Sequence, residues 1–149
     1  MKKIDNFRGQ YYFLSNFYTY PMVYDGIQYQ NSEAAFQAQK CQNRKLRERK
    51  YSTMSPNIAK REGRREKLPD NWDSMTTKIM HDVLLAKFSI PELKDALLST
   101  GDAELEEGNN WHDNNWGNCS CPRCRGIEGQ NRLGKLLMQV REELRKGLE

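Results

Sequence analysis

Two long stretches of the chain carry apolar residues at the three- and four-residue spacing of an amphipathic helix. The first predicts a helix that starts near Asn71 and ends at Phe88, and the second predicts a final helix capped by Asn131. The repeating apolar positions are Trp72, Met75, Ile79, Val83 and Ala86 in the first helix and Leu133, Leu136, Leu137, Val140 and Leu144 in the last. We expect these residues to face the core.

Three further helices are indicated by the residues at their ends. Ser32 is the predicted N-cap of a helix over residues 33–51. Ser55, followed by a proline, predicts a short helix over residues 56–62, and another proline opens a helix over residues 91–98.

Between Tyr11 and Tyr29, aromatic residues alternate with turn signals, which predicts two or three short strands joined by tight turns. The predicted fold class is therefore α+β, as a single, mostly helical domain over residues 1–149 with a few short N-terminal strands. An irregular loop is expected near the C-terminal end.

The composition is typical of a packed globular protein with a hydrophilic surface. Of 149 residues, 37% are hydrophobic and 30% charged, and the 10% that are aromatic are spread along the chain. The longest apolar run is too short for a membrane span, and no secretory leader is recognisable. We expect a cytoplasmic protein with no membrane partner, and the oligomeric state stays open.

The net charge of +4 is modest, but cations cluster in residues 44–50 and 60–67. A solvated helix face explains such clusters in most proteins. The alternative is a rim that binds phosphate. The clusters alone do not indicate a nucleic-acid module, which usually has a higher charge and aromatic residues placed to stack on bases.

Glu33, Gln37 and Lys40 are four and three residues apart, which places them on one face of the predicted helix. A carboxylate at this position can act as a general acid or base, and an amine can bind phosphate or attack a carbonyl. The alternative is an ordinary exposed Glu and Lys on a solvated helix.

Residues 111–117 form a second candidate, a polar loop with two tryptophans. Trp111 and Trp116 can stack on a planar base while Asp113 binds a sugar hydroxyl or a water. Equally, the tryptophans can pin the loop to the body and Asp113 can form a turn. His112 is a weaker catalytic candidate.

Cys119, Cys121 and Cys124 offer three thiolates, one fewer than a structural zinc site needs. A fourth ligand, Cys41 or His112, depends on tertiary structure. We therefore predict no metal and interpret the cluster as reduced thiols, with zinc as the less favoured alternative.

Four blocks in a fixed order carry a resemblance that spans nearly the whole chain. Residues 14–17, 31–40, 113–117 and 129–138 resemble the signatures of the NADAR family of YbiA-like N-glycosidases. The resemblance implies an α+β domain that hydrolyses N-glycosidic bonds without a cofactor. The implied substrates are ribosylamino-pyrimidine phosphates of riboflavin synthesis, or ADP-ribose linked to a base such as guanine in nucleic acid.

The same resemblance implies the site residues. The family's glutamate corresponds to Glu33, its helix lysine to Lys40 and its aspartate to Asp113, which are the catalytic candidates. The substrate-binding candidates are two family tryptophans, one residue of the first block and three arginines suited to phosphate: Trp72, Trp116, Asn16, Arg8, Arg61 and Arg64. Ala34 departs from the family, where a histidine often follows the glutamate.

N-glycoside cleavage needs a proton for the leaving nitrogen and a negative group near the cationic sugar. We expect Glu33 to supply one of these, Asp113 to orient a hydroxyl or water, and a tryptophan to pack on the substrate. In a second route Lys40 forms an imine with the opened sugar. The rival predictions are a module that binds ADP-ribose or a nucleotide without cleaving it, and a zinc-containing interaction domain.

Overall fold

The computed structural model describes residues 2–147, and the chain divides into two compact units. Unit 2 is continuous and runs from Asn16 to Ile90, whereas unit 1 combines the residues up to Ser15 with those from Pro91 onward. Helices and a few short strands make up both units, which confirms the α+β prediction. The prediction of one domain over residues 1–149 stays a prediction.

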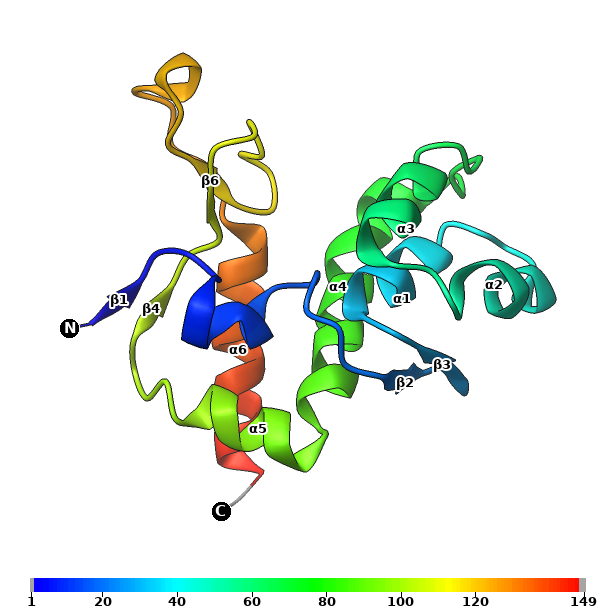
Figure 1. Cartoon of the computed structure of the whole chain (residues 1–149), viewed down its shortest axis with the longest axis horizontal. Helices are drawn as coiled ribbons and strands as arrows, with labels where there is room; N and C mark the ends of the chain where they lie inside the picture. The colour runs from blue at the N-terminus through cyan, green and yellow to red at the C-terminus, as the bar shows by residue number, and fades with distance from the viewer. Residues whose placement is uncertain (1, 148–149) are drawn as a thin grey trace. The chain divides into compact units, whose positions relative to one another are not determined.

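Unit 2 is a helical cluster on a small hairpin (Figure 1). The chain order is β2 (Met22–Tyr24), β3 (Ile27–Tyr29), α1 (Ser32–Ala38), α2 (Arg44–Tyr51), α3 (Pro56–Gly63) and α4 (Trp72–Phe88). Helix α1 is central, because it contacts α2, α3, α4 and β3. Asp25 and Gly26 both have positive φ angles, of 50° and 78°, as a tight hairpin turn requires.

Small side chains let the elements of unit 2 approach α1 closely. Ala34, Ala35 and Ala38 are fully buried, and Cys41 just after the helix is 5% exposed. They pack with apolar residues of the hairpin, α2, α3 and α4, among them Met22, Tyr29, Tyr51, Ala59 and Val83. The small side chains of α1 and Cys41 thus belong to the core of this unit.

The prediction of one helix over residues 33–51 is wrong, because two helices cover this range. After α1 the backbone N–H groups of Lys40 and Cys41 donate to carbonyls three residues back, which tightens and ends the turn. Asn43 then caps α2 by accepting a hydrogen bond from the N–H of Leu46 at 3.1 Å. The N-cap of α1 is Asn31, not Ser32, since the Asn31 side chain accepts from Ala34 N.

The strand prediction is right for residues 22–29 and wrong before them. Residues Gly9–Leu14 form a 3-10 helix, η1, in which Ser15 N donates to Tyr12 O at 2.9 Å. Leu14 is fully buried whereas Tyr12 is 42% exposed. In a strand, residues 12 and 14 would lie on the same face and would have similar exposure. Their different burial is therefore that of a helical turn.

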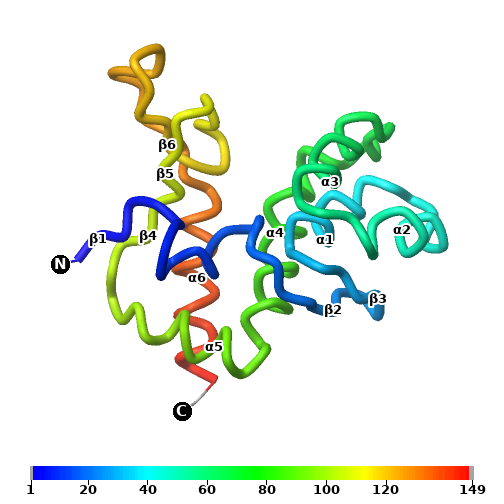
Figure 2. The backbone as a smooth tube through the Cα atoms, viewed as in Figure 1, coloured from blue at the N-terminus to red at the C-terminus, as the bar shows by residue number. Residues whose placement is uncertain are grey.

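Unit 1 is built around α6 (Arg132–Lys146), which packs on α5 (Pro91–Leu98) and on β4 (Glu104–Leu105). Strand β1 (Lys3–Ile4) pairs with β4 in parallel, and β5 (Gly108–Asn109) pairs in parallel with β6 (Asn118–Cys119). The paths of β5 and β6 can be followed in Figure 2. A short 3-10 helix, η2 (Pro122–Cys124), follows β6. Strands are therefore not confined to the N-terminal part, contrary to the prediction.

The helices α3, α4 and α5 begin and end within a residue of their predicted positions. Asn131 does precede α6, but it does not cap it with its side chain. Its backbone is left-handed with φ at 49°, and its amide bonds to Leu105 O at 2.9 Å and Glu107 N at 3.0 Å. These hydrogen bonds join the start of α6 to β4 and to the residues just after β4. No helix within residues 2–147 is long and apolar enough to cross a membrane.

Candidate active site

Glu33 lies in the first turn of α1, and it is 8% exposed. Its backbone N–H donates to Asn16 O at 3.1 Å, so the segment before the hairpin is fastened to the start of the helix. The Asn16 side chain, also 8% exposed, accepts from Ser32 Oγ at 2.8 Å and lies 3.5 Å from Met80 Sδ. Asn16 therefore shapes the surroundings of Glu33, and the expectation of a carboxylate on a solvated helix face does not describe this site.

Lys40 follows α1 and is half-buried. Burial lowers the pKa of its ammonium group, and the nearby Glu33 carboxylate opposes part of that decrease. Its Nζ lies 5.7 Å from the centre of the Trp72 ring. A larger fraction of this amine is neutral than in an exposed lysine, which is the form that reacts with a carbonyl.

Trp72 begins α4 and is 8% exposed. Its ring lies 5.5 Å from that of Phe36 on α1, centre to centre, with the planes tilted by 54°. The structure thus brings Glu33, Lys40 and Trp72 together within unit 2. A tryptophan beside a carboxylate and an amine gives this site an apolar wall.

Gln37 lies on α1, between Glu33 of the same helix and Lys40 just after it in the sequence, and it is 6% exposed. Its amide packs directly on Gly63 of α3, where a Cβ atom would overlap with it. Among the residues that the structure describes, its Oε1 atom has no hydrogen-bond partner. Gly63 is therefore the residue that lets α3 approach α1 at this point.

The predicted phosphate-binding arginines differ in position. Arg64, just after α3, lies close enough to Lys40 to lower its pKa. Arg61 is exposed, and its Nε is 3.9 Å from Glu62 Oε1. Arg8 is an exposed residue of unit 1. Arg64 is thus the arginine with an electrostatic link to the group around Glu33.

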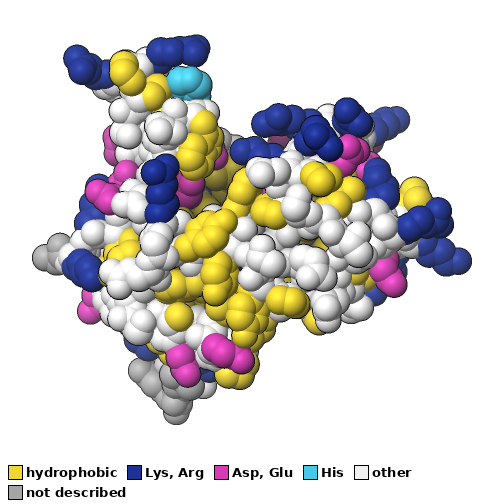
Figure 3. Space-filling view, viewed as in Figure 1, with side chains coloured by type: hydrophobic (Ala, Val, Ile, Leu, Met, Phe, Trp, Pro, Cys, Tyr) yellow, Lys and Arg dark blue, Asp and Glu magenta, His cyan; other side chains and the backbone are white. Residues whose placement is uncertain are grey.

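Lys and Arg side chains gather over α3 and α2 on the face shown in Figure 3. The sequence of residues 16–90 has 13 Lys and Arg against 8 Asp and Glu, whereas the rest of the chain has 11 against 12. The excess positive charge therefore belongs to unit 2.

Asp113 lies in unit 1, and its carboxylate organises its own loop. Its Oδ1 accepts from the backbone N–H groups of Asn115 at 3.0 Å and Trp116 at 2.9 Å. The Asn109 side chain binds both Asp113 N, at 3.2 Å, and Asp113 O, at 2.8 Å. These two hydrogen bonds to Oδ1 are those of an aspartate that forms a turn, which is the alternative interpretation of Asp113.

The two tryptophans of this loop have different surroundings. The Arg132 guanidinium lies 4.2 Å from the centre of the Trp116 ring and covers one face of it. Arg132 also donates to Asn115 Oδ1 at 2.7 Å. Trp111 is 50% exposed, so half of its surface stays open to solvent or to a ligand.

The surroundings of two side chains are decided by the tertiary structure. Lys87 on α4 is 1% exposed, and burial lowers its pKa to about 7. Its Nζ lies 5.0 Å from the ring centre of Phe88 and 5.9 Å from that of Tyr18. His112 lies beside the three cysteines of the cluster, whereas Cys41 is in the core of unit 2. The position of Lys87 inside the mostly apolar run from Leu84 to Phe88 is the sequence signal for its burial.

An α+β fold that places a buried carboxylate beside a half-buried amine of lowered pKa and an aromatic wall has the groups of an acid–base enzyme. Comparisons with known proteins give the family. The NADAR domain model matches residues 5–145, and the chain belongs to this family.

The relatives carry enzymatic names. N-glycosidase YbiA of Escherichia coli is 40% identical over 133 residues, which are 87% of this chain and 79% of that protein. Riboflavin biosynthesis protein VVA0006 of Vibrio vulnificus is 32% identical over 90% of this chain and 36% of its own length. The NMR structure of E. coli YbiA matches with a TM-score of 0.83 at 39% identity and covers all of this chain and 90% of that one. The chain is a hydrolase that acts on N-glycosyl bonds.

Proposed function

We propose that this hydrolase cleaves the N-glycosidic bond of a phosphorylated ribosylamine or of ADP-ribose attached through nitrogen to a base such as guanine. The observation that carries the proposal is the group of Glu33, Lys40 and Trp72 around α1 in unit 2. The names of the relatives support both the reaction and a substrate related to riboflavin synthesis.

In the proposed mechanism Glu33 acts at the anomeric carbon. It either gives a proton to the leaving nitrogen or, as a carboxylate, stabilises the cationic sugar. Its low exposure favours either role, because electrostatic interactions are stronger where water is excluded. Trp72 supplies an apolar surface for the base or ribose, and Arg64 and Arg61 are the proposed partners of the phosphate.

Asp113 and Trp116 are proposed as substrate contacts because of the family resemblance. Since Asp113 Oδ1 already accepts two backbone hydrogen bonds, we assign the contact with a ribose hydroxyl or water to its other oxygen. Asn16 and Arg8 stay proposed substrate-binding residues, with Asn16 acting through the position of Ser32 and Glu33.

A second route uses Lys40, whose lowered pKa favours the neutral amine. In this route the amine adds to C1 of the ring-opened sugar, the base leaves as its free amine, and water then hydrolyses the resulting imine. Borohydride added during turnover would reduce the imine to a stable adduct. An adduct on Lys40 would select this route, and unmodified protein would leave direct acid-assisted hydrolysis.

The first prediction concerns Glu33→Gln, which keeps the shape of the side chain and removes its acid–base chemistry. We expect turnover of at least one of two substrates, a ribosylamino-pyrimidine phosphate or guanine-linked ADP-ribose, to fall about a hundredfold or more. Mass spectrometry of the released base and sugar measures it. Glu48→Gln, at an exposed position on α2, is the matched control and should retain wild-type turnover.

A Glu33→Gln protein that keeps more than about a tenth of wild-type turnover would remove Glu33 from the chemistry. If the wild type binds both substrates and cleaves neither, that result would support the rival prediction of a module that binds without cleaving. The product that is detected identifies the substrate class.

A further inference from the structure

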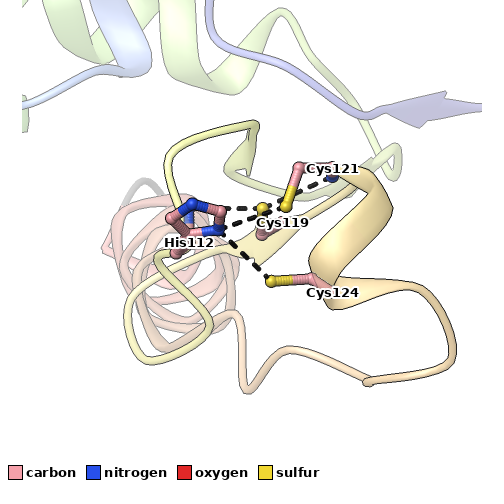
Figure 4. A group of neighbouring side chains, drawn as sticks. All are labelled: His112, Cys119, Cys121 and Cys124. Carbon is pink, nitrogen blue, oxygen red and sulfur yellow. Dashed lines mark hydrogen bonds between the residues drawn. The ribbon is translucent and has the colours of Figure 1, made fainter.

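A cluster of four potential metal ligands lies in unit 1, outside the residues proposed for catalysis. One ligand atom from each of His112, Cys119, Cys121 and Cys124 lies within 4.8 Å of the others (Figure 4). The His112 Nδ1 atom is 3.1 Å from Cys121 Sγ and 3.7 Å from Cys124 Sγ. The histidine comes from the loop after β5, and the cysteines come from β6, from the position just before η2 and from the last residue of η2.

We propose that these four residues form a closed, structural zinc site. Zinc prefers four tetrahedral ligands, and three thiolates with one imidazole are a common set. At Zn–S distances of about 2.3 Å, tetrahedral geometry separates two sulfurs by about 3.8 Å and a sulfur from a nitrogen by about 3.5 Å. The His112 Nδ1 distances of 3.1 and 3.7 Å to two of the sulfurs are close to this value, and all four ligand atoms lie within 4.8 Å of one another, so side-chain movements of about 1 Å or less suffice to enclose an ion.

Hydrogen bonds to the sulfurs support thiolate ligands. The backbone N–H groups of His112 and Cys121 both donate to Cys119 Sγ, at 3.3 and 3.4 Å. The Asn114 side chain donates to Cys124 Sγ at 3.4 Å. A neutral thiol sulfur is a weak acceptor, whereas a metal-bound thiolate gains from such donors, which also orient the ligand.

The backbone of the β5–β6 region places the histidine and the cysteines near one another. Asn109 pairs with Cys119 in the β5–β6 ladder, which aligns the two ligand segments. His112 has a left-handed backbone with φ at 70°, a conformation in which Asn, Asp and His are the most frequent residues after glycine, and this turn brings the imidazole to the cysteines.

Disulfide bonds explain the cluster less well. Three cysteines cannot all pair with one another, and Cys41 is buried in the core of unit 2. A disulfide would also leave His112 without a role.

The second ring nitrogen of His112 lies beside an arginine, because Nε2 is 3.4 Å from Arg123 Nη1. When Nδ1 binds zinc, Nε2 carries a proton, and two donors then face each other. We therefore expect the exposed Arg123 to turn to solvent in the metal-bound protein.

The proposed ion would act on the loop that carries the family residues. Asp113 directly follows His112, and Asn114 bonds through its side chain to both Cys119 N, at 2.8 Å, and Cys124 Sγ. Zinc would thereby hold residues 112–116 against the cysteine segment. With four protein ligands no position stays open for water, so the site is structural and takes no part in the hydrolysis.

The test is the metal content of full-length protein purified under reducing conditions without added metal. We expect about one zinc per chain in the wild type and in Cys41→Ala, and far less in Cys121→Ser. Cys41→Ala is the matched control, because it removes a cysteine outside the cluster. A wild type with less than about a tenth of an equivalent of zinc, or equal zinc in Cys121→Ser, would overturn the proposal.

A second measurement does not depend on the folding of a variant. Wild-type protein stripped of metal is titrated with cobalt, and we expect the intense visible absorption of tetrahedral cobalt bound to thiolates, saturating near one equivalent. The weak spectrum of octahedral cobalt would contradict the proposal. Neither readout uses glycosidase activity, so the zinc proposal and the proposed function fail or succeed separately.

Discussion

At the scale of single residues, Lys87 shows how burial changes a common side chain. It is 1% exposed on α4 between aromatic neighbours, and its pKa is lowered to about 7 because water is excluded from the charged form. The folded protein then binds fewer protons than the unfolded chain between pH 7 and the ordinary lysine pKa. Folding stability contributed by this residue therefore rises with pH in that window.

This sign leads to a prediction for Lys87→Met. Relative to the variant, the wild type should gain on the order of 2 kcal/mol of unfolding free energy between pH 7 and pH 9, because its lysine becomes neutral over that range. Urea unfolding of both proteins at the two pH values measures the change. Lys67→Met removes an exposed lysine and should show no such trend. A pH-independent difference for Lys87→Met would contradict the lowered pKa.

At the scale of elements, the contact between α1 and α3 positions the proposed catalytic group. Gln37 packs on Gly63, and the flanking residues Glu33 and Lys40 share its helix or the turn after it. A side chain on α3 at this point would push the two elements apart or displace the Gln37 amide.

Gly63→Ala should therefore lower both stability and turnover. We expect a loss of about 1–3 kcal/mol from overpacking and roughly a tenfold or greater loss of turnover from misplacement of α1. Thermal unfolding and the mass-spectrometric assay measure the two effects. In Gly147→Ala, the added methyl group meets ordinary contacts at 3.6 Å, so this variant is the control. Wild-type behaviour of Gly63→Ala would show that α3 yields to the methyl group without cost.

At the scale of the whole molecule, positive charge is distributed unevenly. Residues 16–90 carry the excess of Lys and Arg and also Glu33 and Lys40, while the remaining residues are nearly balanced. A phosphorylated substrate is attracted to such a surface before it binds, and salt screens that attraction.

For a cleaved phosphorylated substrate, kcat/KM should fall several-fold when ionic strength rises from about 20 mM to about 200 mM. Steady-state kinetics of the wild type and of a Lys45→Gln, Arg49→Gln double variant test this. Both residues are exposed on α2 and outside the proposed site, so the variant should keep kcat and show a weaker salt dependence. Equal salt dependence in the two proteins would assign the effect to other charges.

Much of the fold follows from local signals along the chain. The apolar spacing and end residues of α3, α4, α5 and α6 predict these helices almost to the residue, because caps and helical periodicity act over a few positions. The predicted helix over residues 33–51 does not contain the break between α1 and α2, although Asn43 is a local capping signal. The strand prediction, which begins at Tyr11, is wrong for residues 11–14 because aromatic-rich segments suit both strands and tight helical turns.

By itself, the sequence determined the fold class, the family and the identities of the residues proposed for catalysis, since these depend on spacing and motifs. Only the tertiary structure decided that His112 meets Cys119, Cys121 and Cys124, that Lys87 is buried, and that Asn131 bonds to residues near 105. These features depend on which distant segments pack together, and the free energy of such packing is not encoded in any short stretch of the chain.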